Sequence, residues 1–95
     1  MMYKLFDITD KVIVVTGGTG VLGSAMVEYL AKHKAKLVVM ARNKIKGNAL
    51  VDRVKEQDGE AIFISCDVNS SDALQKAKDL IISKYNSIDV LINGA

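Results

Sequence analysis

Four short runs of apolar residues recur along the chain, and segments of a different period separate them. The runs are Val12–Val15, Leu37–Met40, Ala61–Ile64 and Val90–Ile92. None alternates with polar residues, and continuous apolar runs of this length are typical of strands that helices cover on both faces. A buried helical segment is the competing interpretation, but it would need longer runs. The pattern therefore predicts four strands of a parallel sheet.

The segments between the runs repeat every three to four residues, as amphipathic helices do. Their apolar stripes comprise Leu22, Met26, Leu30 and His33 in the first segment, Leu50, Val51 and Val54 in the second, and Leu74, Ala77, Ile81 and Tyr85 in the third. We expect Gly59 to end the second helix as a left-handed cap. The third should begin after the capping residues 70–72 and end at Asn86.

The order strand, helix, strand, helix, strand, helix, strand has a topological consequence. Parallel neighbours cannot be joined by a short hairpin, so each connection must cross over, and such crossovers are right-handed. The pattern predicts an α/β fold with a doubly wound parallel sheet. At 95 residues the chain is one domain at most.

Composition narrows the class of protein further. The chain is 49% hydrophobic and 25% charged, with a formal net charge of +2 spread along its length. This charge is too small and dispersed to indicate nucleic acid or a membrane surface as a partner. There is no apolar stretch of about 18 residues and no signal peptide at the start. The single cysteine, Cys66, fits a reducing compartment, so we expect a soluble cytoplasmic protein acting on a small molecule.

A glycine-rich loop, Thr16–Gly23, directly follows the first strand and opens the first helix. Gly18, Gly20 and Gly23 have the spacing G-x-G-x-x-G, which lets a backbone approach a pyrophosphate and lets the helix pack close to the strand. The helix start would offer N–H groups and the positive end of its dipole to the phosphates. A tight turn without a ligand is the alternative, and a P-loop is excluded because no Gly-Lys-Ser/Thr follows. Placement after the first strand favours a dinucleotide.

Three motifs in order resemble the short-chain dehydrogenase/reductase family: Thr16-Gly17 after the first strand, Asp67-Val68 after the third, and Leu91–Ala95 after the fourth. The resemblance implies a seven-stranded Rossmann-type sheet that binds NAD(H) or NADP(H). It further implies that Asp67 hydrogen-bonds the adenine, that Val68 packs on it, and that residues 93–95 lie along the ribose towards the nicotinamide. Asp67 could instead cap its loop, and Asn93 could simply close a strand.

The predicted cofactor-binding residues are Gly17, Gly18, Thr19, Gly20, Val21, Leu22, Gly23, Arg42, Asn43, Asp67, Val68, Asn93, Gly94 and Ala95. The loop spacing Thr-Gly-x-x-Gly-x-x-Gly resembles the extended branch of the family, which includes nucleotide-sugar epimerases and dehydratases. The residues from Leu5 to the end of the glycine-rich loop, taken together with the Asn-Gly-Ala motif at 93–95, look more like compact-branch oxidoreductases of sugar acids. The type they resemble acts on D-mannonate or fructuronate. Hydride transfer to such a substrate and nucleotide-sugar chemistry are therefore both open.

Catalytic residues are not expected within this chain. In the family the tyrosine acid, its lysine, a serine and an asparagine follow the Asn-Gly-Ala motif, and Tyr3, Tyr29 and Tyr85 do not fit that place. No cluster has metal-ligand spacing, and His33 is expected at a helix end. We expect residues 1–95 to be the NAD(P)-binding domain of an oligomeric oxidoreductase of roughly 250 residues, because the fourth strand would otherwise be a bare edge. A complete, non-catalytic dinucleotide-binding module is the alternative.

The end of the second strand indicates which dinucleotide is preferred. A carboxylate about 20 residues past the last glycine would bind ribose hydroxyls, but that place falls on Ala41, with Arg42 beside it. The Arg42 guanidinium can bind a 2′-phosphate, with Asn43 and Lys44 adding polarity and charge. We therefore predict NADP(H) over NAD(H). The alternative is that Arg42 is only a solvated residue.

Overall fold

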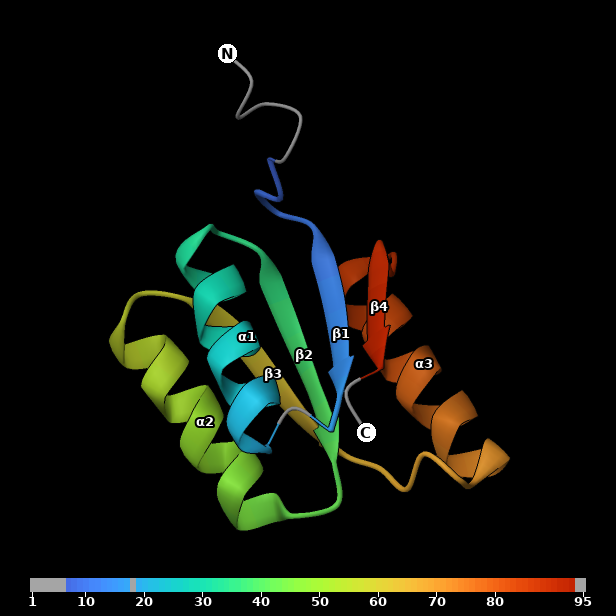
Figure 1. The fold of residues 1–95 in the computed structure, drawn as a ribbon. Helices are drawn as coiled ribbons and strands as arrows, with labels where there is room; N and C mark the ends of the chain where they lie inside the picture. Colours follow the sequence, from blue (N-terminus) through green and yellow to red (C-terminus); the bar gives the residue numbers. More distant parts are fainter. Residues whose placement is uncertain (1–6, 18, 94–95) are drawn as a thin grey trace.

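The seven predicted elements are all present in the computed structural model, which describes residues 7–17 and 19–93 (Figure 1). The strands are β1 (Val12–Thr16), β2 (Lys36–Ala41), β3 (Glu60–Ser65) and β4 (Val90–Asn93). The helices are α1 (Val21–Lys32), α2 (Lys44–Glu56) and α3 (Ser71–Tyr85). The predicted alternation of strands and helices is confirmed.

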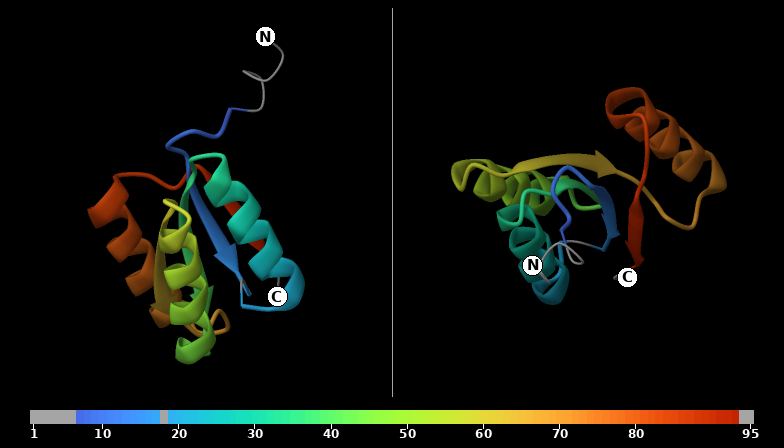
Figure 2. Two further views of the ribbon diagram at one scale, coloured as in Figure 1. Left: turned by 90° about the vertical axis from the view of Figure 1, so that its left-hand side faces the viewer. Right: turned by 90° about the horizontal axis from the view of Figure 1, so that it is seen from above.

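The strands form one parallel sheet in the order β3-β2-β1-β4. The helices α1 and α2 cover one face and α3 covers the other (Figure 2). The strand order reverses between β1 and β4, and in open α/β sheets ligands bind outside the carboxyl ends of the strands at such a switch point. We call the side of the sheet where all four strands end the carboxyl edge.

The two central strands are buried on both faces, as their continuous apolar runs predicted. Side chains that face α1 and α2 alternate with side chains that face α3. The first set includes Ile13, Val15, Leu37 and Val39, and the second includes Val12, Val14, Val38 and Met40. The core is therefore two thin apolar layers with the sheet between them.

The stripe predicted for α1 is partly wrong. The buried residues are Val27 and Ala31, whereas Leu22 is 78% exposed and His33 is also exposed. Gly23 lies four residues before Val27 on the same face. The helix thus turns its row of small side chains towards the sheet, which lets it lie close to the strands, and Leu22 lies outside this contact.

The predicted cap of α2 is also wrong. The left-handed residue after this helix is Asp58 (φ 63°), and the positive-φ residues do not include Gly59. A Cβ on Gly59 would lie 2.7 Å from Cγ1 of Val54 and 3.2 Å from Cβ of Ala31, so this glycine is needed for packing. The predicted ends of α3 are confirmed, since the Ser70 hydroxyl caps its start and Asn86 (φ 68°) ends it. Within its stripe Leu74 is 38% exposed and less buried than predicted.

A second glycine brings α2 into direct contact with β3. Gly47 is buried inside the helix, and its Cα faces the ring of Phe63 so closely that an added Cβ would overlap three ring atoms. Glycine usually weakens a helix interior, by about 1 kcal/mol relative to alanine. Its presence here is explained by the aromatic ring, which occupies the space of a side chain.

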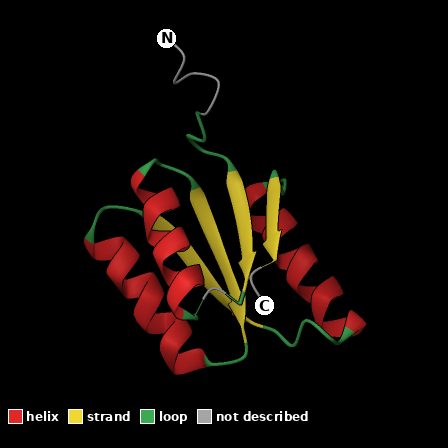
Figure 3. Ribbon diagram, viewed as in Figure 1, coloured by secondary structure: helices red, strands yellow, loops and turns green. Residues whose placement is uncertain are grey.

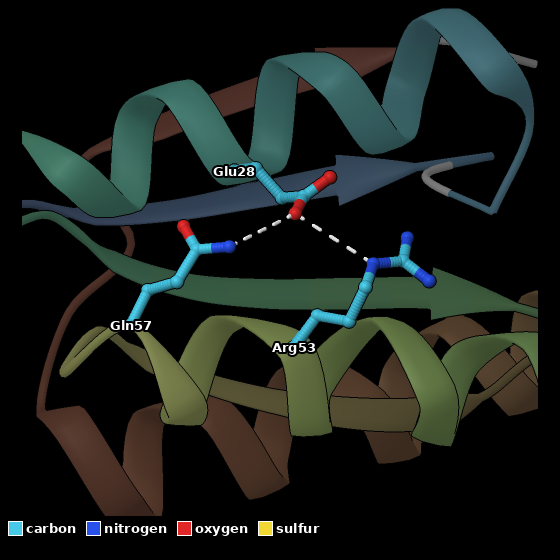
Figure 4. Close-up of polar contacts among 3 residues, drawn as sticks. All are labelled: Glu28, Arg53 and Gln57. Atoms are coloured by element: carbon cyan, nitrogen blue, oxygen red, sulfur yellow. Dashed lines mark hydrogen bonds and ion pairs between the residues drawn. The ribbon is translucent and has the colours of Figure 1, made fainter.

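Polar groups bridge α1 and α2 on the outer surface (Figure 4). Oε1 of Glu28 lies 3.6 Å from Nε of Arg53 and 3.5 Å from Nε2 of Gln57. Exposed pairs of this kind contribute little because water screens the charges and the side chains lose conformational entropy. We expect Arg53→Ala to lower the free energy of unfolding by no more than about 0.5 kcal/mol in urea titrations. A loss above about 1.5 kcal/mol would contradict this view of the surface.

Candidate functional site

The carboxyl edge gathers the predicted site residues from four separate segments, in the loops after β1, β2 and β3 and at the end of β4 (Figure 3). Thr16 is the last residue of β1, Arg42 directly follows β2, Asp67 follows β3 by two residues, and Asn93 ends β4. The strands are parallel, so the segments that follow them meet at one edge. Gly18, Gly94 and Ala95, which belong to the same prediction, lie outside the described residues.

The loop after β1 turns sharply at Gly17. This residue has a φ of 71°, which favours glycine, and its N–H donates to the carbonyl of Met40 at 2.9 Å. Gly20 is different, because its φ is −72° and an added Cβ would meet only the Gly17 carbonyl, at an ordinary 3.8 Å. Neither conformation nor packing within the described chain requires glycine at position 20. A close approach by a ligand does supply a reason, so the loop fits a pyrophosphate.

The start of α1 is suited to an anion. Its N-cap is Gly20, no side chain of the described residues caps it, and its first turn contains no acidic residue. The other two helices differ, since Asn43 caps α2 and Ser70 caps α3 through their side chains. The first N–H groups of α1 and the positive end of its dipole are therefore directed at the loop, where phosphate oxygens can accept from them. Val21, 94% exposed, leaves this end open.

Thr16 joins the two strands at the switch point. Its side chain is buried, and Oγ1 donates to Oδ1 of Asn93 at 3.0 Å and lies 3.4 Å from the carbonyl of Ile92. The backbone of Asn93 pairs with Thr16 in the β1–β4 ladder. Asn93 therefore closes a strand, which is the alternative that the sequence left open beside a role in ligand binding. Its side chain is held at the carboxyl edge by Thr16. The sequence had given no signal for the Thr16–Asn93 bond.

Asp67 caps its own loop, as its alternative interpretation predicted. Oδ1 accepts from the N–H of Asn69 at 3.0 Å, and the Asp67 carbonyl accepts from Ser70 at 3.0 Å. A carboxylate has about four lone-pair positions, so one turn bond is compatible with a second acceptor role. The bond to adenine stays a prediction. Val68 is half-buried and lines a hollow of about 460 Å³ together with Thr16 and Asn93.

A group of cations surrounds the start of α2. Arg42, Lys44 and Lys46 are exposed, and the first turn contains no acidic residue. Oδ1 of Asn43 accepts from the N–H of Lys46 at 3.0 Å, so this side chain is used as the helix cap. Cations near the positive end of a helix dipole are unfavourable by a few tenths of a kcal/mol each. Positive potential is therefore concentrated beside the end of β2, where an added anion would relieve it.

The remaining reactive side chains lie away from this cluster or are buried. Tyr29 contacts His33 at the end of α1, and the ring of Tyr85 lies 5.6 Å from Nζ of Lys36 at the start of β2. Both tyrosines are thus at the end of the sheet opposite Thr16. Burial and a neighbouring Glu60 raise the pKa of Tyr85 above its usual range. Burial also raises the pKa of the Cys66 thiol, so this residue behaves as a small buried hydrophobe.

Residues 7–17 and 19–93 contain no group of three or more potential metal-ligating side chains. Within the same ranges, no helix combines the length and apolar character that crossing a membrane requires.

A family model, relatives in sequence and solved structures all indicate the same protein family for this chain. The model of the short chain dehydrogenase family matches residues 11–95. The oxidoreductase UxuB of Bacillus subtilis, itself uncharacterized, is 38% identical over 94% of this chain and 32% of its own length. A putative D-mannonate oxidoreductase from Haemophilus influenza with bound NAD superposes with a TM-score of 0.90, at 26% identity over 94% of this chain and 32% of that one.

A metagenomic short-chain oxidoreductase in complex with NADP superposes with a TM-score of 0.85, at 29% identity over 90% of this chain and 38% of that one. The chain therefore spans about a third of the length of the relatives that it matches. Both NAD and NADP occur among the similar structures, so the likeness indicates a nicotinamide cofactor without distinguishing the two.

Proposed function

Because the chain belongs to the short-chain dehydrogenase family, we propose that it is the NAD(P)(H)-binding part of an oxidoreductase. The whole enzyme transfers hydride between the nicotinamide and a carbonyl or alcohol substrate. The observation that carries this proposal is the convergence of Thr16, Arg42, Asp67 and Asn93 with an uncapped helix start at one edge of the sheet. In this proposal residues 1–95 form one cofactor-binding domain. The acid and the base of the reaction come from outside it.

The residues at the edge divide the cofactor between them. The N–H groups of the loop and of the start of α1 bind the pyrophosphate, Gly20 keeps a side chain out of its way, and Gly23 lets α1 pack close to the sheet. Asp67 and Val68 take the adenine, and Asn93, oriented by Thr16, lies beside the ribose. When bound, the nicotinamide would donate hydride to a carbonyl or accept it from an alcohol. The chain's own contribution is binding and orientation of the dinucleotide.

The preferred cofactor in this proposal is NADP(H). Ala41 stands where a carboxylate would bind the ribose hydroxyls, so nothing there repels a 2′-phosphate. The Arg42 guanidinium follows directly, and Lys44 and Lys46 add charge at the start of α2. A phosphate placed here would receive charge-assisted hydrogen bonds and offset the repulsion among three cations.

Isothermal titration of the 95-residue chain tests the preference directly. We expect NADPH to bind at least about tenfold more tightly than NADH, a difference of about 1.4 kcal/mol, and Arg42→Ala to remove most of that ratio. Arg53→Ala is the matched control, since it removes the same side chain from the far end of α2. Tighter binding of NADH, or a ratio that Arg42→Ala leaves within about threefold, would show that Arg42 is not the selector.

The proposal also covers the substrate class, the cellular location and the oligomeric state of the whole enzyme. A sugar acid is the substrate class that the resemblance to a D-mannonate oxidoreductase supports. A cytoplasmic location is supported by the one cysteine, which is free and buried. Association of the whole enzyme into oligomers is proposed by analogy with the compact branch alone.

A further inference from the structure

We propose that Asn93 is a site of spontaneous deamidation, and that the pairing of β4 with β1 controls how fast the reaction proceeds. The reacting pair is an asparagine followed by a glycine, Asn93-Gly94, and the product is a carboxylate at the carboxyl edge. The site and its control depend on the sequence and the sheet alone. Only the effect of the product on the cofactor rests on the proposed function.

The residue after Asn93 makes this asparagine reactive. Glycine has no Cβ, so it leaves its peptide nitrogen open to the preceding side chain and lets the backbone reach conformations that other residues avoid. Gly94 lies outside the described residues, and only its chemical identity matters for the reaction. The asparagines that precede lysine, alanine or serine instead are Asn43, Asn48, Asn69 and Asn86.

The reaction needs water alone as co-reactant. The backbone nitrogen of Gly94 attacks Cγ of Asn93, so that a C–N bond forms and the bond from Cγ to Nδ2 breaks. The proton of the Gly94 N–H leaves with the side-chain nitrogen as ammonia, and a succinimide ring remains. Water then opens the ring at either carbonyl, which gives aspartate or isoaspartate. No group is oxidised or reduced.

The described conformation of Asn93 opposes this ring closure. Asn93 ends β4, and its backbone pairs with Thr16 in the parallel β1–β4 ladder (Figure 1). An extended backbone directs the next peptide nitrogen away from the side chain, whereas the succinimide requires both on the same side. The side chain is held as well, since Oγ1 of Thr16 donates to Oδ1 of Asn93 at 3.0 Å. The end of β4 must therefore leave β1 before Asn93 reacts.

The end of β4 is suited to such local opening. Asn93 is exposed and is the last residue of a strand of four residues, of which Leu91 is 66% exposed. Segments with few buried apolar contacts open at a lower free energy than the core strands do. The observed rate of deamidation is then the rate of the open chain multiplied by the fraction of time that the end of β4 is open.

The product changes the cofactor site in either of its two forms. Aspartate adds a negative charge at the edge that receives the dinucleotide in the proposed function, so it repels the anionic cofactor. Isoaspartate carries an additional methylene in the backbone, so it also disturbs the pairing of position 93 with Thr16. A bound cofactor has the reverse effect. It stabilises the closed end of β4 and so protects Asn93 from the reaction.

Mass spectrometry of tryptic peptides measures the reaction. The 95-residue chain is incubated at neutral pH, and the peptide of residues 85–95 is followed, which contains both Asn86 and Asn93. A synthetic peptide of the same sequence gives the rate without the sheet. We expect Asn93 to react at least about tenfold more slowly in the folded chain than in the peptide, yet faster than Asn86 in that chain. Equal rates in chain and peptide overturn the control by β4, and a rate at Asn93 no greater than at Asn86 overturns the site.

Substitution of Thr16 tests the control by the β1–β4 ladder. Thr16→Val removes the hydroxyl but keeps the shape, so it should raise the rate in the folded chain about fivefold, the equivalent of one hydrogen bond. Thr16→Ser keeps the donor and should stay within about twofold of the wild type. Equal rates for the two variants would mean that the bond does not hold Asn93. Gly94→Ala is the chemical control and should slow chain and peptide alike, at least about tenfold, because a Cβ hinders the attack.

The cofactor provides the last measurement and separates the two proposals. Saturating NADPH should slow the reaction of the folded chain at least about tenfold, and Asn93→Asp should weaken NADPH binding at least about fivefold in isothermal titration. If NADPH binds but neither effect appears, the link between Asn93 and the cofactor is wrong. If NADPH does not bind while Thr16→Val still accelerates the reaction, the proposed function is wrong and the modification site stands.

Discussion

Gly47→Val is expected to destabilise the chain by more than about 3 kcal/mol, a large share of the total stability of a domain this small. The cause is the contact between α2 and β3, where the ring of Phe63 occupies the position of a Cβ. A valine adds two methyl groups beyond that Cβ, so α2 must move away from the sheet or the ring must leave its place. Urea unfolding followed by circular dichroism measures the loss.

Two further variants separate packing from helix propensity. Asn48→Val places the same side chain on the exposed side of α2, so it should lower the free energy of unfolding by less than about 0.7 kcal/mol. Gly47→Ala should destabilise in the wild-type background yet become favourable when Phe63→Ala has opened the space, since alanine is the better helix former. A stabilising Gly47→Ala in the presence of Phe63 would mean that the ring does not abut the helix.

Asp89→Ala is expected to lower the free energy of unfolding by about 2 to 3 kcal/mol. Oδ2 of Asp89 accepts from the N–H of Val12 at 2.8 Å, and the Asp89 N–H donates to the Val12 carbonyl at 2.9 Å. Val12 is buried and its bond to Asp89 is partly buried, so removing the carboxylate leaves the Val12 N–H without this acceptor. The cost of that unsatisfied donor exceeds the net contribution of an ordinary hydrogen bond. Thermal and urea unfolding both report it.

The conservative variant and a surface control give this prediction its specificity. Asp89→Asn retains an oxygen acceptor and should recover most of the loss. Asp79→Ala removes a carboxylate that accepts from Gln75 on the exposed surface of α3, and should cost less than about 0.5 kcal/mol. If Asp89→Ala and Asp79→Ala proved equally mild, the bond to Val12 would not contribute to stability.

The strands were predictable because burial on both faces leaves a direct trace, a continuous apolar run such as Val12–Val15. The orientation of α1 was not. Leu22 has the size and spacing of a core residue, but the helix packs through Val27 and Ala31. Because α1 lies close to the sheet, the residues that contact the sheet are small. The hydrophobic pattern alone does not show whether the side of the helix with small residues or the side with the large Leu22 packs on the sheet.

The candidate site was predictable in outline for a related reason. Parallel strands bring their ends to one edge, so the order of the elements sufficed to place Arg42 near Asp67. The contacts that orient the site were not predictable. Thr16 and Asn93 are 77 residues apart in the sequence, and no local period or spacing encodes their bond. The role of Asp67 in its own turn was foreseen, because a short-range bond depends only on residues a few positions away.

The pairing of β4 with β1 also has a consequence for the order of folding. Val14 pairs with Leu91, so this ladder closes the longest loop in the sheet, whereas β1, β2 and β3 are joined through nearer neighbours. Long loops cost more entropy to close, and contacts between distant residues form slowly. During synthesis the ribosome releases β4 after the other six elements described here, so the edge of β1 that pairs with β4 waits unpaired. The nascent chain is most exposed to misassociation during that interval.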